Sequence, residues 1–139
     1  MRLFIDANVI VSVLNKEYPL FTYSSRILSL AGNTRYKLFT SPVCLAIAFY
    51  FAEKKYKAAN AKEKITLLST HIELAEINKA AVKKTAANPK ILDFEDGLEY
   101  YAALGSNCKC IITEDVEDFH FSEIEVLNCE QFFRKYMKK

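Results

Sequence analysis

The sequence has no apolar run long enough to cross a membrane, because the apolar stretch at Pro42–Ala52 falls far short of a spanning helix. It also has no signal-peptide pattern, and its first apolar segment, Arg2–Ile5, is typical of a strand. From these two absences we expect a cytoplasmic protein that has no membrane partner.

The motifs of several common enzyme classes are also missing. The chain contains neither a GxxxxGK[ST] phosphate loop nor a GxGxxG dinucleotide fingerprint, so nucleoside triphosphate hydrolysis and dinucleotide redox chemistry are poorly supported. His71 and His120 have no nucleophile pattern near them, and we expect both on the surface. With a net charge of +2, any affinity for nucleic acid must come from local patches such as Lys54, Lys55 and Lys57. Such a run is usually a solvated helix face, but it can also hold a phosphate backbone.

The cysteines form no CxxC pair, and all of them lie in or beside apolar segments: Cys44, Cys108, Cys110 and Cys129. This placement predicts reduced thiols in the core. Zinc is the alternative, but one CxC and two histidines make a poor ligand set. The chain of 139 residues is long enough to bury a core without disulfides, and we expect a single domain over residues 1–139.

Short apolar runs alternate with helical patterns along the chain. The runs predict strands at Arg2–Ile5, Tyr36–Thr40, Ile72–Leu74, Lys109–Thr113 and Ile124–Leu127. The intervening patterns predict helices at Asn8–Leu14, Thr22–Leu30, Pro42–Lys55, Lys57–Thr70, Asn78–Ala87, Asp93–Leu104 and Glu130–Met137. This alternation predicts an α/β fold, a three-layer α/β/α sandwich with a mainly parallel five-stranded sheet.

Acidic side chains stand at three places in this pattern. Asp6 ends the first strand, where it either caps the next helix or faces the crevice at the sheet edge. Asp93 and Asp96, spaced i, i+3, lie at the start of a helix. They either stabilise the positive end of the helix dipole or both face one side of the first turn, towards a ligand. Asp115 and Asp118 follow the fourth strand. They either belong to a solvated acidic loop or face the same crevice as Asp6.

The topology of such a fold brings these places together. A helix runs opposite to the strand that it precedes, so its start lies at the same edge as the loop after that strand. Carboxylates gathered there would repel one another unless a cation neutralised them. Oxygen ligands alone predict Mg²⁺ or Mn²⁺. Asn8 either caps the helix as well or hydrogen-bonds Asp6 and orients it. Glu99, one turn after Asp96, either reaches the same pocket or is a surface charge.

Taken together, these segments resemble the PIN-domain family of metal-dependent nucleases. The resemblance covers essentially the whole chain through FIDANVIVSVL at Phe4–Leu14, TSPVCLAIAFYFAEKK at Thr40–Lys55, DFEDGLEYYAAL at Asp93–Leu104, CIITEDVEDF at Cys110–Phe119 and IEVLNCEQFF at Ile124–Phe133. It implies hydrolysis of RNA phosphodiester bonds with Mg²⁺ or Mn²⁺. Many family members are toxins of toxin–antitoxin pairs, so the resemblance also implies a small antitoxin partner. Family members are often dimers, so it implies a homodimer as well.

The resemblance assigns roles to individual residues. The acidic positions of the family fall on Asp6, Asp96 and Asp115, and the hydroxyl beside the metal falls on Thr113. Asp93 and Asp118 are then supporting carboxylates.

The sequence departs from the family pattern at one position. Many active members carry a glutamate in the helix after the second strand, and the matching residue here is Ile47. One hypothesis is that Glu99 supplies the missing charge, and another is that metal affinity is low. The alternative function is therefore a catalytically weakened PIN-like module that binds RNA or a protein.

Overall fold

A computed structural model describes residues 1–137 of the chain. Its centre is a five-stranded sheet in the order β3-β2-β1-β4-β5, in which every neighbouring pair is parallel. The strands are β1 (Arg2–Ile5), β2 (Lys37–Thr40), β3 (Glu73–Leu74), β4 (Cys110–Ile112) and β5 (Glu125–Leu127). The order reverses between β1 and β4, because the chain adds β2 and β3 on one side and β5 on the other.

Burial explains why β1 is the central strand. Leu3, Phe4 and Ile5 are 0% exposed, as expected for a strand that is covered on both faces. Leu3 is in register with Leu38 of β2 on one side and with Cys110 of β4 on the other. The apolar run therefore ends at the carboxyl edge of the sheet, and Asp6 is the first residue beyond it.

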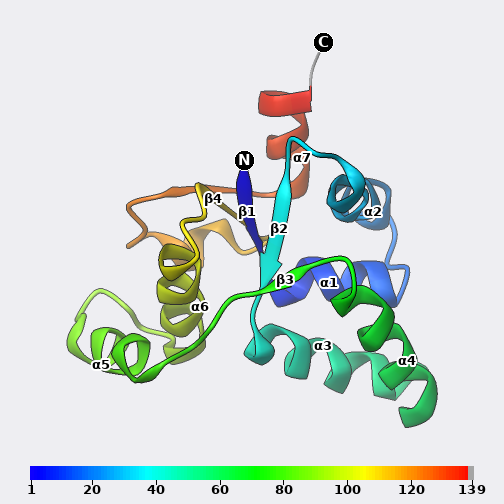
Figure 1. Ribbon diagram of the computed structural model, residues 1–139, viewed down its shortest axis with the longest axis horizontal. Helices are drawn as coiled ribbons and strands as arrows, with labels where there is room; N and C mark the ends of the chain where they lie inside the picture. Colours follow the sequence, from blue (N-terminus) through cyan, green and yellow to red (C-terminus); the bar gives the residue numbers. More distant parts are fainter. Residues whose placement is uncertain (138–139) are drawn as a thin grey trace.

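Helices pack on both sides of the sheet. They are α1 (Ala7–Leu14), α2 (Phe21–Ser29), α3 (Pro42–Lys55), α4 (Ala58–Ser69), α5 (Lys79–Ala87), α6 (Phe94–Gly105) and α7 (Cys129–Phe132). Figure 1 shows the sheet nearly edge-on, with α5 and α6 to one side of it and α2 to the other. The predicted α/β/α sandwich is thereby confirmed. None of the helices within residues 1–137 has the length and apolarity to span a membrane.

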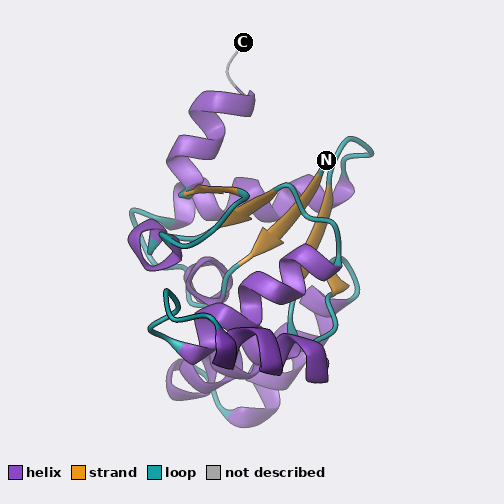
Figure 2. Cartoon of the chain, turned by 90° about the vertical axis from the view of Figure 1, so that its left-hand side faces the viewer, coloured by secondary structure: helices purple, strands orange, loops and turns teal. Residues whose placement is uncertain are grey.

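Local detail differs from the sequence prediction at a few places. β3 is only two residues long and both are exposed, so it is a minimal edge strand. The loop after β4 contains a 3-10 helix at Val116–Phe119, and a π-helical turn at Phe133–Met137 continues α7. Figure 2 shows the strands lying between helices. All of the cysteines are buried and free, which confirms the prediction of core thiols.

A close contact sets the position of α6 against α5. Gly97 faces Thr85 of α5, and a Cβ atom at position 97 would lie 2.4 Å from Thr85 Cγ2 and 2.9 Å from Ile91 Cγ2. The contact matters for the site because α6 begins at the carboxyl edge of the sheet and carries Asp96 in its first turn.

We therefore expect Gly97→Ala to lower the free energy of unfolding by about 1–3 kcal/mol, the usual cost of overpacking. Gly105→Ala is the matched control, since it lies in the same helix and a Cβ atom there would meet nothing within 4 Å beyond that helix. That control should be neutral or stabilising by less than about 1 kcal/mol. Urea denaturation measures both, and equal midpoints for the two variants would contradict the packing argument.

Candidate metal centre at the carboxyl edge of the sheet

All the aspartates of the chain line one cavity of about 400 Å³ at the carboxyl edge of the sheet. They come from the end of β1, the start of α6 and the segment after β4, as the sequence predicts: Asp6, Asp93, Asp96, Asp115 and Asp118. In Figure 1 the β2 arrow points towards this edge, where α1 and α3 lie. The cavity therefore occupies the crevice at the reversal of strand order, the usual ligand position in open α/β sheets.

A hydrogen-bond network centred on Thr113 joins the ends of β1 and β4. The Thr113 hydroxyl, 0% exposed, donates to Asp6 Oδ2 (2.7 Å) and accepts from Asn8 Nδ2 (3.2 Å) and from the Asp115 N–H (3.1 Å). Asn8 Nδ2 also donates to Asp115 Oδ2 at 3.0 Å, and Asn8 Oδ1 accepts from the Glu114 N–H. Three of the predicted site residues and Asn8 are thus held by direct contacts.

Asp6 has both of the roles that its position allows. It is the N-cap residue of α1, and its Oδ1 accepts from the Ala7 N–H at 2.6 Å. Its side chain is only 7% exposed, and it lines the acidic cavity. The capping role and the cavity role are therefore compatible, because the two carboxylate oxygens have different partners.

Asp93 and Asp96, both at the start of α6, have different roles: Asp93 caps the helix and Asp96 lines the cavity. Asp93 caps α6, where its Oδ1 accepts from the N–H groups of Glu95 (2.9 Å) and Asp96 (3.3 Å). Asp96 is half-buried in the cavity wall. Burial, and after it the negative charges of the other aspartates, raise the pKa of Asp96 to about 7.

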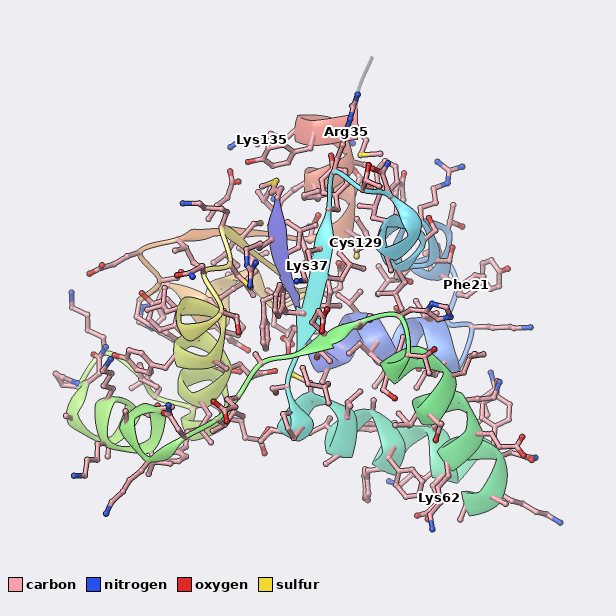
Figure 3. All side chains as sticks on the ribbon, in the orientation of Figure 1. Phe21, Arg35, Lys37, Lys62, Cys129 and Lys135 are labelled. Atoms are coloured by element: carbon pink, nitrogen blue, oxygen red, sulfur yellow. The ribbon has the colours of Figure 1, made fainter. Side chains whose placement is uncertain are left out.

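Basic residues do not neutralise this cluster within residues 1–137. The ion pairs there are Lys37–Glu73, Arg134–Glu130 and Lys135–Glu125, none of which includes a cavity carboxylate. Arg35 and Lys135 lie at the opposite end of the strands (Figure 3). A cavity with oxygen ligands, negative charge and no cationic side chain in contact fits Mg²⁺ or Mn²⁺.

The carboxylate oxygens of Asp6, Asp96 and Asp115 do not form one compact group. In the described part of the chain, the one set of three acidic, cysteine or histidine side chains with all ligand atoms within 4.8 Å of one another is Asp6, Cys44 and Glu99. Asp6, Asp96 and Asp115 line the same cavity without meeting that distance. Binding of an ion by these three carboxylates would therefore require side-chain rotation towards it.

Of the two interpretations of Glu99, the surface charge was wrong, and Glu99 lines the acidic cavity. It is 2% exposed, because it follows Asp96 by one turn on the helix face that α6 turns inwards. Burial in the first place, and the nearby Asp6 carboxylate in the second, raise the pKa of Glu99 to about 11. In the absence of a bound cation, the Glu99 carboxyl is therefore neutral at pH 7.

Sequence reasoning missed several contributors to this region. Cys44, 0% exposed, lies in the first turn of α3, and its thiol hydrogen-bonds Glu99 Oε1. Burial and the nearby carboxylates raise the pKa of Cys44 above its usual range. Glu17 and Phe51 line the acidic cavity as well. The spacing of Cys44, Ala48 and Ala52 marks the buried face of α3, but nothing in the sequence places Glu17 there.

A second cavity, of about 450 Å³, lies between α1, α2 and α4 and has a different character. Its walls are mostly apolar and carry no carboxylate, and the polar groups in it include Lys16, Lys64 and His71. It contains none of the predicted site residues, so the candidate chemistry belongs to the acidic cavity alone.

Comparison with known proteins agrees with this geometry. A profile of the PIN domain matches residues 2–117. Ribonuclease VapC1 of Aquifex aeolicus (strain VF5) is 28% identical over 97% of this chain and 95% of that protein.

Solved structures show the same fold. VapBC2 from Rickettsia felis, bound to a DNA fragment from its promoter, aligns with a TM-score of 0.69 at 18% identity, over 92% of this chain and 98% of the matched chain. VapC20 from Mycobacterium tuberculosis, a toxin that cleaves the sarcin–ricin loop, aligns with a TM-score of 0.66 at 13% identity, over 88% and 98%. The resemblance inferred from the sequence is thereby confirmed.

The first test of the site concerns the Thr113 hydroxyl. Thr113→Val should lower the free energy of unfolding by about 1–3 kcal/mol, because it leaves the buried Asp6 Oδ2 without its donor. Thr113→Ser keeps the hydroxyl and should cost less than about 1 kcal/mol, the contribution of one methyl group. The two variants are compared by urea denaturation at pH 7, and a Val variant as stable as the Ser variant would contradict the network.

The second test uses the titration of Asp96 in the presence of EDTA. Its folded-state pKa is raised from 3.8 to about 7, so between these values the folded protein holds a proton that the unfolded chain releases. Wild type should therefore lose stability relative to Asp96→Asn as the pH rises from about 4 to about 7, and the difference should then level off. Urea denaturation across this range measures it, and parallel curves would show that Asp96 is not perturbed.

Proposed function

The chain belongs to the PIN-domain family, and we propose that it is a divalent-metal-dependent endoribonuclease that acts as the cytoplasmic toxin of a toxin–antitoxin pair. The observation that carries this proposal is the convergence of every aspartate of the chain on one cavity at the carboxyl edge of the sheet. Because no lysine or arginine of residues 1–137 forms an ion pair with them, a bound cation is the natural source of neutralising charge.

The proposed roles follow from the contacts. Asp6, Asp96 and Asp115 would hold Mg²⁺ or Mn²⁺, with Asp118 as a supporting carboxylate of the same wall. Thr113 fixes the Asp6 carboxylate through its hydrogen bond, and Asn8 holds Asp115 in the same way. Asp93 keeps the first turn of α6, and with it Asp96, at the cavity.

The reaction that suits this arrangement is hydrolysis of an RNA phosphodiester. A bound ion supplies Lewis-acid stabilisation of the phosphoryl charge and lowers the pKa of a water molecule. The residues of the chain contribute orientation, since the network around Thr113 fixes Asp6 and Asp115 relative to each other before a substrate binds. Asp96, with a pKa near neutrality, would release its proton as the positive charge of an ion arrives.

Relatives support the assignment of substrate and partner. The similar protein of A. aeolicus is a ribonuclease, and the similar structure from M. tuberculosis is a toxin that cleaves the sarcin–ricin loop. The VapBC-1 structure from nontypeable Haemophilus influenzae, with a TM-score of 0.66 at 18% identity over 94% of this chain and 99% of the matched chain, points to an antitoxin for this chain as well. The homodimer implied by the family resemblance stays a prediction.

Asp6→Asn tests the function directly. Wild type with Mn²⁺ should cleave a structured RNA pool, EDTA should stop the cleavage, and Mn²⁺ should restore it. Asp6→Asn should reduce the rate by more than about 100-fold, beyond the 10–100-fold typical of residues that only support a metal ligand. Gel electrophoresis of end-labelled RNA provides the measurement.

The control is Glu76→Gln, which removes one exposed acid that does not line the acidic cavity. It should leave cleavage within about twofold of wild type, and circular dichroism should show that both variants are folded. Metal-dependent cleavage that persists in Asp6→Asn would refute the proposed centre.

A further inference from the structure

Helix α3 distributes its side chains in an unusual way. The α3 residues that are 0% exposed are small: Cys44, Ala48 and Ala52, at i, i+4 and i+8. Leu45, Ile47 and Phe49 are partly buried and also pack against the core. Two aromatic side chains of α3 face the solvent, since Tyr50 is 53% and Phe51 45% exposed. Two adjacent aromatic side chains that are this exposed, on a helix that already packs against the core through other residues, mark a surface that contacts something else.

This surface is continuous with the acidic cavity. Ile47 and Phe51, one helical turn apart, both line the wall of that cavity. Tyr50 lies beside Phe51 with 5.3 Å between ring centroids and an interplanar angle of 83°. Lys54, one turn further on, places Nζ 4.2 Å from the Tyr50 ring centroid and 5.8 Å from that of Phe51. We call Ile47, Tyr50, Phe51 and Lys54 the α3 platform.

The platform is held on a rigid base. The Phe51 carbonyl accepts a hydrogen bond from Asn15 Nδ2 at 3.4 Å, and the Tyr56 hydroxyl donates to the Leu14 carbonyl at 3.1 Å. Lys55 Nζ donates to the Asn15 carbonyl. The last turns of α3 are therefore fixed against the end of α1, while Lys54, which is exposed and in none of the ion pairs of residues 1–137, keeps its charge for a partner.

We propose that the α3 platform binds an unpaired base of a single-stranded RNA segment next to the phosphate held at the acidic cavity. Aromatic faces stack with any base, and a neighbouring lysine neutralises the backbone, which is the usual composition of single-strand binding surfaces. Continuity with the cavity favours RNA over a protein partner, because a strand whose phosphate lies at the aspartates must pass over the residues that flank them. This inference rests on the proposed function and narrows its substrate to unpaired RNA.

Binding is measured in an Asp6→Asn background with Mn²⁺, so that the RNA stays intact. The probe is a short fluorescein-labelled RNA without self-complementarity, and its affinity is read by fluorescence anisotropy. Phe51→Leu, which keeps apolar cover but removes the aromatic face, should weaken binding by at least about fivefold, the low end of the effect of one stacked base. Phe51→Trp should bind within about twofold of the parent or more tightly.

Removal of the base provides an independent readout. A probe with abasic positions should bind the parent at least about fivefold more weakly and should bind Phe51→Leu without a further loss, because the same stacking contact is removed in both. Lys54→Gln should lower the salt dependence of binding. Its control, Lys109→Gln, changes an exposed lysine beside the start of β4, at the amino edge of the sheet, and should leave the salt dependence unchanged.

Several outcomes would overturn the proposal. Equal affinity of Phe51→Leu and the parent would do so, and so would a preference for the matched duplex over the single strand. A change of oligomeric state in Phe51→Leu by sedimentation, with RNA affinity unchanged, would make the platform a protein interface. If wild type binds RNA through stacking but shows no Mn²⁺-dependent cleavage, the platform stands and the nuclease proposal fails.

Discussion

The hydrogen bond between the Thr113 hydroxyl and Asp6 Oδ2 connects two strands that are far apart in the sequence but adjacent in the sheet. Backbone pairing already joins these strands, since the Asp6 N–H donates to the Ile112 carbonyl at 3.0 Å. The side-chain hydrogen bond in addition fixes the orientation of the buried Asp6 carboxylate. Asn8 and the Asp115 N–H also bond to this hydroxyl, so one buried oxygen atom contacts the end of β1, the first turn of α1 and the loop after β4.

A cavity lined by acids lowers stability, and the chain reduces that penalty differently at each position. Asp93 directs its charge at the N–H groups at the start of α6, where the helix dipole favours it. In the cavity without a cation, Glu99 carries no charge at neutral pH, because burial and the nearby Asp6 carboxylate raise the pKa of its carboxyl. Asp96 stands between these cases, with a pKa near 7. The repulsion that is left over is typical of functional sites, where residues are placed for binding rather than for stability.

Local pattern was sufficient to predict most of the fold and the places where the aspartates gather. The strands ended where apolar runs met Asp6 and Thr113, and chain order alone brought those ends to one edge. The sequence left Glu99 open between the cavity and the surface, because its exposure depends on how α6 packs against α3, which a single helix does not reveal. Cys44 was correctly placed in the core, yet its contact with Glu99 joins two helices across 55 residues of sequence. Glu17 and Phe51 reach the cavity only through tertiary packing.

Ile47 stands where many members of the family carry a glutamate, and this difference changes the character of the cavity wall from acidic to apolar. A glutamate at that position would add another negative charge to a cavity in which repulsion already raises the pKa of Asp96. Isoleucine lowers that repulsion and, with Phe51 one turn later, makes one wall of the cavity apolar. Under the proposed function, the carboxylates from β1, α6 and the loop after β4 are enough to hold an ion, and the α3 wall is then free to contact a base. Ile47 thus offers no metal ligand, and it begins the apolar wall that continues into the α3 platform.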